Sequence, residues 1–217
     1  MFCYQCEQTA LGRACEKVGV CGKTAQVSDL QDLLTYTLRG LALAAREARK
    51  VGACDPATGP FLAQALFSTL TNVNFDGPRF AALIAESVRR RDALVAATLA
   101  KGGAAPAQPA ATFVPAGDLD GLTAQAELHG LNAEPAAADP DVRSLQHTVL
   151  LGLRGIAAYA DHAHILGRPD DAVYAFLEKA LAAPYDAGLG LGEWVGLAME
   201  AGAANLKAME LLDAANT

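Results

Sequence analysis

The chain has 217 residues, of which 52% are hydrophobic and 19% are charged, and its formal net charge is −7. This composition is typical of a globular domain and excludes a disordered chain, and the many alanines favour packed helices over a sheet. The acidic balance argues against a nucleic-acid partner, and no apolar stretch approaches the roughly 20 residues that cross a bilayer.

Four of the five cysteines lie within the first 21 residues, at Cys3, Cys6, Cys15 and Cys21, with the spacing C-x2-C-x8-C-x5-C. Disulfides would explain this density only in an oxidising compartment. The start Met-Phe-Cys-Tyr lacks the basic and apolar regions of an export signal, which predicts a cytoplasmic protein. Structural zinc usually takes two close cysteine pairs, and only Cys3 and Cys6 form one.

An iron–sulfur cluster is the third chemistry that these cysteines allow. Such clusters favour a C-x2-C start followed by ligands in a short loop. The loop is rich in glycine, which lets the backbone fold closely: Gly12, Gly19 and Gly22. Positive charge at Arg13, Lys17 and Lys23 would offset thiolate charge, although solubility explains these side chains equally well. The spacing favours the cluster and leaves zinc and disulfides open.

The sequence behind this loop predicts helices. Ser28 and Asp29 can cap a helix over about 30–51. Asp55-Pro56 opens a second helix, because proline at the first helical position loses no hydrogen bond. A turn at 71–78 precedes a third helix over about 79–101. We expect the three arginines at 89–91 to form a solvated face.

The second half of the chain repeats the first. Residues 145–181 align with residues 30–66 without a gap, and 15 of the 37 positions are identical, including Arg39 with Arg154 and Gly40 with Gly155. Both glycines fall in the middle of predicted helices, which suggests close helix contacts. The sequence therefore predicts an all-α protein built from two repeated three-helix bundle units packed together, with an N-terminal cysteine-rich cluster-binding loop.

These observations divide the chain into four expected parts. They are the cysteine-rich iron–sulfur loop 1–26, a first three-helix unit 27–101, an Ala/Pro-rich linker 102–139 and a second three-helix unit 140–217. One short helix is expected inside the linker, around 118–129.

The remaining candidates for chemistry have plainer interpretations. Cys54 stands apart from the other cysteines and reads as a free thiol. The histidines lack a partner at ligand spacing, so we expect surface or capping roles for His129, His147, His162 and His164. The sequence supports no catalytic residue.

Several segments spread along the chain are distinctive: FCYQCEQTA with the following cysteines, LQDLLTYTLRG (30–40), TNVNFD (71–76), DVRSLQH (141–147), GIAAYADHA (155–163) and NLKAMELLDAANT (205–217). Together they resemble the hybrid cluster proteins, the family known as hydroxylamine reductases or prismane proteins. They follow the family's order along the whole chain. The resemblance implies that Cys3, Cys6, Cys15 and Cys21 ligate a proximal 4Fe–4S cluster.

In this family, later α/β domains hold a second, hybrid cluster that reduces hydroxylamine to ammonia or nitric oxide to nitrous oxide. The chain ends where family members continue into those domains, so we expect an oxidoreductase domain for electron transfer that is not catalytic alone. The implied partners are a redox protein as electron donor and the hybrid-cluster domains, in cis or in trans. An exposed apolar patch or a homodimer is expected without them. The alternative is a helical interaction module with structural zinc.

Overall fold

A computed structural model describes residues 1–130 and 139–216 of the chain. It confirms the all-α class, since the described residues form eight α-helices, two short 3-10 turns and no strand. The helices are α1 Ala25–Lys50, α2 Thr58–Phe67, α3 Gly77–Ala100, α4 Pro109–Thr112, α5 Leu119–His129, α6 Pro140–Ile165, α7 Asp171–Ala182 and α8 Leu191–Asn216. Within the described ranges, no helix combines the length and apolarity that a membrane span requires.

Helix α1 is the centre of the fold. Every residue from Leu33 to Ala45 is buried, because α3, α4, α5 and α7 all pack around this helix. The helix begins earlier than the sequence suggested, since Thr24 is the N-cap and its side chain accepts a hydrogen bond from the Val27 amide. The expected cap at Ser28 and Asp29 is therefore wrong. Asp29 instead pairs with the N-terminal ammonium of Met1 at 3.1 Å.

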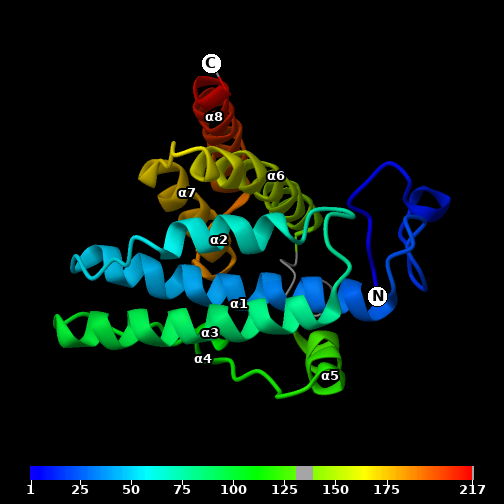
Figure 1. Ribbon diagram of the computed structural model, residues 1–217, viewed down its shortest axis with the longest axis horizontal. Coiled ribbons are helices and arrows are strands. Elements are labelled where there is room, and N and C mark those ends of the chain that lie inside the picture. Colours follow the sequence, from blue (N-terminus) through cyan, green and yellow to red (C-terminus); the bar gives the residue numbers. More distant parts are fainter. Residues whose placement is uncertain (131–138, 217) are drawn as a thin grey trace.

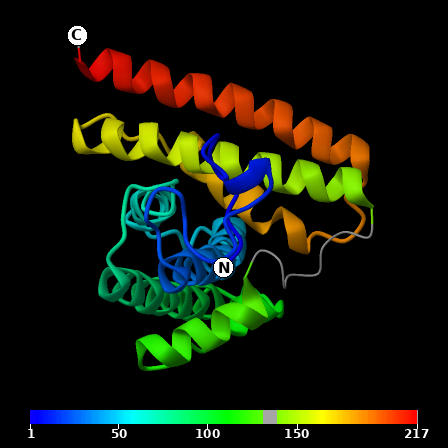
Figure 2. The same ribbon diagram turned by 90° about the vertical axis from the view of Figure 1, so that its right-hand side faces the viewer.

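The long helices form two layers. Helices α1 and α3 lie side by side in one layer, and α6 and α8 lie side by side in the other, running across the first (Figures 1 and 2). The second helix of each half packs mainly on the first helix of the other half: α2 on α6, and α7 on α1. Helices α1–α3 and α6–α8 thus repeat in order and similar length, while two separate three-helix bundles are not confirmed.

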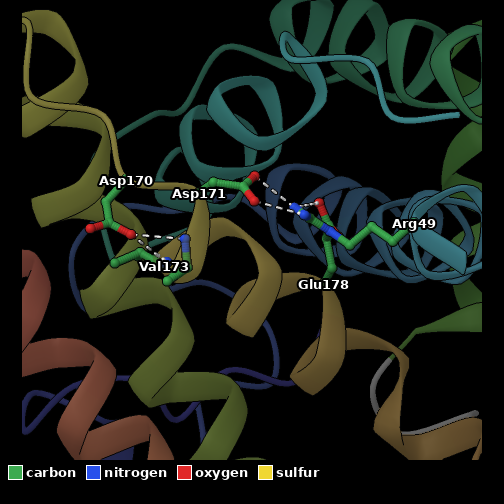
Figure 3. Close-up of polar contacts among 6 residues, drawn as sticks. Arg49, Asp170, Asp171, Val173 and Glu178 are labelled. Atoms are coloured by element: carbon green, nitrogen blue, oxygen red, sulfur yellow. Dashed lines mark hydrogen bonds and ion pairs between the residues drawn. The ribbon is translucent and has the colours of Figure 1, made fainter. Parts of the chain in front are cut away.

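Ion pairs connect the C-terminal end of α1 to α7. The guanidinium of Arg49 donates to Glu178 at 2.5 and 3.1 Å and to Asp171 at 2.8 and 2.9 Å (Figure 3). The Glu178 side chain is buried, whereas the Asp171 side chain is 77% exposed. Asp170 caps α7 by accepting from the amides of Ala172 and Val173 (Figure 3). The pairs with Arg49 therefore connect the two halves of the chain.

The repeated glycines behave differently. A Cβ on Gly40 would lie 2.1 Å from the carbonyl oxygen of Ala110, so α4 can approach α1 only because residue 40 has no side chain. Gly155 has no such neighbour within 4 Å, and the expected close contact there is wrong. Arg91 also departs from expectation, because it is buried and donates to the carbonyl of Phe113 at 2.7 Å instead of facing solvent.

Two short helices in the segment between the two halves pack on α1. Helices α4 and α5 contact α1, and Ala110 and Phe113 are buried. The expected short helix corresponds to α5. The rest of the expected linker, residues 131–138, lies outside the described residues. The division into four expected parts stays a prediction.

Candidate functional site

The N-terminal loop folds back on itself beside the start of α1 (Figure 1). Cys3 and Cys15 form an isolated antiparallel bridge, in which each amide donates to the other carbonyl at 3.1 and 2.8 Å. Further along the loop, the Gly19 amide donates a hydrogen bond to the carbonyl of Lys23 at 2.8 Å. These backbone bonds bring residues distant in sequence to one end of the helical body.

The turn from residue 19 to residue 23 requires glycine. A Cβ on Gly19 would lie 3.0 Å from Cβ of Lys23 and 3.1 Å from Sγ of Cys21, so a larger residue would displace one of them. Gly22 has a φ of +87°, which is a left-handed conformation that other residues rarely adopt. Both glycines therefore fix the path of the chain around Cys21.

All four N-terminal cysteines line one cavity of about 410 Å³. Cys15 is buried at its base, Cys3 is partly buried, and Cys6 and Cys21 are exposed. The other lining residues are Gln5, Glu7, Gln8, Thr9, Gly19, Val20, Lys23, Thr71 and Asn72. The tertiary structure thus brings together the four thiols that the spacing singled out, with room between them.

The cavity wall favours negative charge on sulfur. Backbone hydrogen bonds from Ala10 and Val20 lower the pKa of Cys15, and the charge of Lys23 lowers it further. Lys23 is only 1% exposed, and its Nζ lies 3.9 Å from Sγ of Cys3 and 2.7 Å from Oε1 of Gln31. A lysine is rarely buried without a negative partner. Lys23 is therefore a buried cation beside Cys3 and not the solvated charge that the sequence had equally allowed.

The loop at 71–76 forms part of the site. Its Thr71 amide donates to Oε1 of Gln5 at 2.9 Å, and both Thr71 and Asn72 line the thiol cavity. Sequence reasoning had treated this segment as a turn and had given Gln5 no role. The only sequence signal for this role was that TNVNFD (71–76) is one of the segments that carry the family resemblance.

The four thiols surround a space without meeting at one point. In the described part of the chain, no group of three or more histidine, cysteine or acidic side chains could hold a metal ion. Around a single zinc ion with Zn–S bonds of about 2.3 Å, tetrahedral geometry would bring the sulfurs to about 3.8 Å from one another. Four thiols are a donor set that both structural zinc and iron–sulfur clusters take.

The other candidate residues lie elsewhere. Cys54 is exposed beside Arg49, in a separate cavity of about 340 Å³. His162 is exposed, as is His164. His129 lies in the last turn of α5, partly exposed, and stacks on Tyr36 with ring centroids 4.6 Å apart. His147 lies inside α6 and hydrogen-bonds the hydroxyl of Tyr4 through Nδ1, so it does not have the expected surface or capping role.

A helical body with a thiol-lined cavity at one end defines a class of cysteine-rich helical domain. Residues 1–217 match the Prismane/CO dehydrogenase family, so the chain belongs to this family. It is 58% identical over 218 residues to a hydroxylamine reductase of Syntrophobacter fumaroxidans, 56% to one of Solidesulfovibrio magneticus and 50% to one of Methanocella arvoryzae. Each match covers 100% of this chain but 40% of the relative. The chain thus spans less than half the length of these relatives.

Proposed function

We propose that Cys3, Cys6, Cys15 and Cys21 hold a 4Fe–4S cluster and that the chain is an electron-transfer domain of a hydroxylamine reductase. The observation that carries this proposal is the convergence of the four thiols on one cavity beside the buried Lys23. When bound, such a cluster supplies a one-electron couple whose potential depends on charge, on hydrogen bonds to sulfur and on solvent exposure.

The residues of the chain control these three properties. The amides of Ala10 and Val20 donate toward Cys15, and Lys23 supplies positive charge that offsets the thiolates. Cys15 lies on the buried side, whereas Cys6 and Cys21 lie on the exposed side. We infer that electrons from a redox partner enter through the exposed side, because electron transfer needs a close approach.

Reduction of hydroxylamine to ammonia consumes two electrons and two protons and releases water. A one-electron site would pass these electrons singly to a catalytic centre outside the present sequence. The relatives that carry the name hydroxylamine reductase extend well beyond the matched part. We assign the catalytic step to such further domains, in cis or in trans, and electron delivery to this chain.

Helix α8 presents a surface for that further polypeptide. Its exposed apolar side chains recur at helical spacing and form one stripe: Leu191, Val195, Met199, Leu206 and Met209. The helix lies at the edge of the molecule and packs on α6 and α7 (Figure 2). An apolar stripe of this kind is typical of a surface that another domain covers. A homodimer through the same stripe is the alternative.

The cluster proposal is tested on protein purified anaerobically. The wild-type chain, the four single Cys→Ser variants at the cavity and a Cys54→Ser control are compared for iron, acid-labile sulfide and zinc. We expect about four iron and four sulfide per chain in the wild type and in the control, because Cys54 lies outside the cavity. Each cavity variant is expected to lose most of both.

Two results would contradict the proposal. Unchanged iron content in the Cys6→Ser variant would remove this residue from the ligand set. One zinc per chain without sulfide would instead support the alternative, an interaction module with a structural zinc site.

A further inference from the structure

Arg154 on α6 is a fully buried cation without a hydrogen-bond partner. Its exposed fraction is 0%, and its Nε and both terminal nitrogens have no acceptor among the described residues. A guanidinium stays charged in proteins, and burial without a partner disfavours that charge. Burial accordingly lowers the pKa of Arg154, while Asp32 and Cys3 act in the opposite direction. A compensating negative charge is therefore expected nearby.

The position of Arg154 points to the thiol site. Arg154 lines a small cavity of about 10 Å³ together with Cys3, Gln5, Asp32 and His147. Cys3 and Gln5 also line the larger thiol cavity, so the N-terminal segment separates the two spaces. A volume of this size holds about one water molecule, which excludes a bulky anion as the partner.

The repeat supplies an internal comparison. Arg39 occupies the position in α1 that Arg154 occupies in α6, and it too is buried. Arg39 has a hydrogen bond with Tyr185 and lines a different small cavity, next to Trp194. Cys3 is among the groups that act on the charge of Arg154, but not among those that act on Arg39. The equivalent arginines are both influenced by Asp32, and the charge of Arg154 acts on Arg39, but only Arg154 lies behind a cysteine.

We propose that Arg154 is a positioning residue whose buried charge sets the reduction potential of the site that Cys3 helps to form. This inference rests on the proposed cluster. Reduction adds one negative charge, and a fixed positive charge in a poorly solvated environment stabilises the reduced form. Asp32 lines the same cavity from α1, and its negative charge would destabilise the reduced form.

The test is a redox titration of anaerobically prepared protein, followed by electron paramagnetic resonance. The variants are Arg154→Gln, Arg154→Met, Arg154→Lys, Asp32→Asn and Arg39→Gln. At the wild-type midpoint, loss of the Arg154 charge should lower the ratio of reduced to oxidised protein at least tenfold, which is about 59 mV for a one-electron couple. The Lys variant should stay near wild type, the Asn variant should shift to higher potential, and the Arg39 variant should shift little.

The outcomes distinguish an effect of the Arg154 charge from a role of Arg154 in packing. An unchanged midpoint in a fully loaded Arg154→Gln protein would overturn the inference, and so would an equal shift in Arg39→Gln. If Arg154→Lys loads iron but neither uncharged variant does, the charge is required at the site and the inference stands. If none of the three Arg154 variants loads, the role of Arg154 is in packing and the inference falls. Absence of iron and sulfide from the wild type would instead refute the proposed function.

Discussion

Replacing Arg49 by methionine tests how the two halves of the chain are held together. Methionine keeps most of the length of the side chain but removes its charge. Arg49 then leaves behind two carboxylates in different environments: the Glu178 side chain is 4% exposed, and the Asp171 side chain is 77% exposed. The structure therefore predicts that almost all of the lost stability comes from Glu178.

The expected magnitude follows from burial. Removing one partner of a buried ion pair costs about 3–5 kcal/mol. Because Arg49 is itself 30% exposed, we expect the lower part of this range or slightly less, about 2–3 kcal/mol. For a chain of this size, that loss corresponds to a decrease in Tm of about 5–10 °C. The control Asp171→Asn removes an exposed pair and should cost less than about 1 kcal/mol.

The effect should depend on pH. Burial raises the pKa of Glu178 above its usual value, although the hydrogen bond from Arg49 lowers it. A carboxyl with a raised pKa in the folded state destabilises the fold as the pH rises above the unfolded value of about 4.3. Without Arg49 this penalty is larger. The deficit of Arg49→Met should therefore be largest near pH 8 and should shrink toward pH 4.

Urea unfolding at a series of pH values measures both effects. The double variant Arg49→Met, Glu178→Gln should be more stable than Arg49→Met alone at pH 8, because no buried carboxylate is left without a partner. Equal losses in Arg49→Met and Asp171→Asn would refute the reasoning, as would a deficit that is the same at pH 4 and pH 8.

Two further predictions concern α1, α3 and α6. Gly40→Ala should lower the free energy of unfolding by about 2–3 kcal/mol, because its Cβ would meet the carbonyl of Ala110, whereas Gly155→Ala should raise it by up to about 1 kcal/mol. Thermal melts followed by circular dichroism compare the two, and similar effects of both changes would contradict the packing difference. Hydrogen bonds from Arg89, and also from the next arginine, lower the pKa of Glu86 to about 2. Glu86→Gln should therefore cost up to about 1 kcal/mol at pH 7, and the difference from wild type should fall as the pH drops from about 4.3 through about 2. A difference that is as large at pH 2 as at pH 7 would exclude this charge effect.

Capping residues and glycines in the sequence predicted the helices, but some helix ends were predicted at the wrong residues. The positive φ of Gly52 matches the expected end of the first helix. An Asp-Pro pair does open α6, which Asp139 caps, but the pair Asp55-Pro56 that was expected to open the second helix lies before it, since α2 begins at Thr58. The first helix nevertheless begins at Ala25 and is capped by Thr24 instead of Ser28 or Asp29, because three side chains that can cap a helix lie within six residues. Only the position of the preceding loop selects among them.

The sequence predicted which cysteines form the candidate site but not what surrounds them. The spacing singled out Cys3, Cys6, Cys15 and Cys21, and these residues do line one cavity. Nothing in the sequence indicated that Lys23 would be buried beside them or that Gln5 would join the loop at 71–76. Those roles depend on contacts between segments that are far apart along the chain.

By itself, the amino-acid sequence determined the helical class, the repeat and the group of thiols, since periodicity, caps and cysteine spacing act over a few residues. The tertiary structure decided what each repeated residue does. Arg39 and Arg154 occupy equivalent positions in the repeat, yet one has Tyr185 as a partner and the other lies behind Cys3. Gly40 admits α4, whereas Gly155 has open space around it. The physical reason is that the charge and packing of a buried residue depend on its neighbours in space: α4 packs on α1, the first copy, while Cys3 in the N-terminal loop lies beside Arg154 in the second copy.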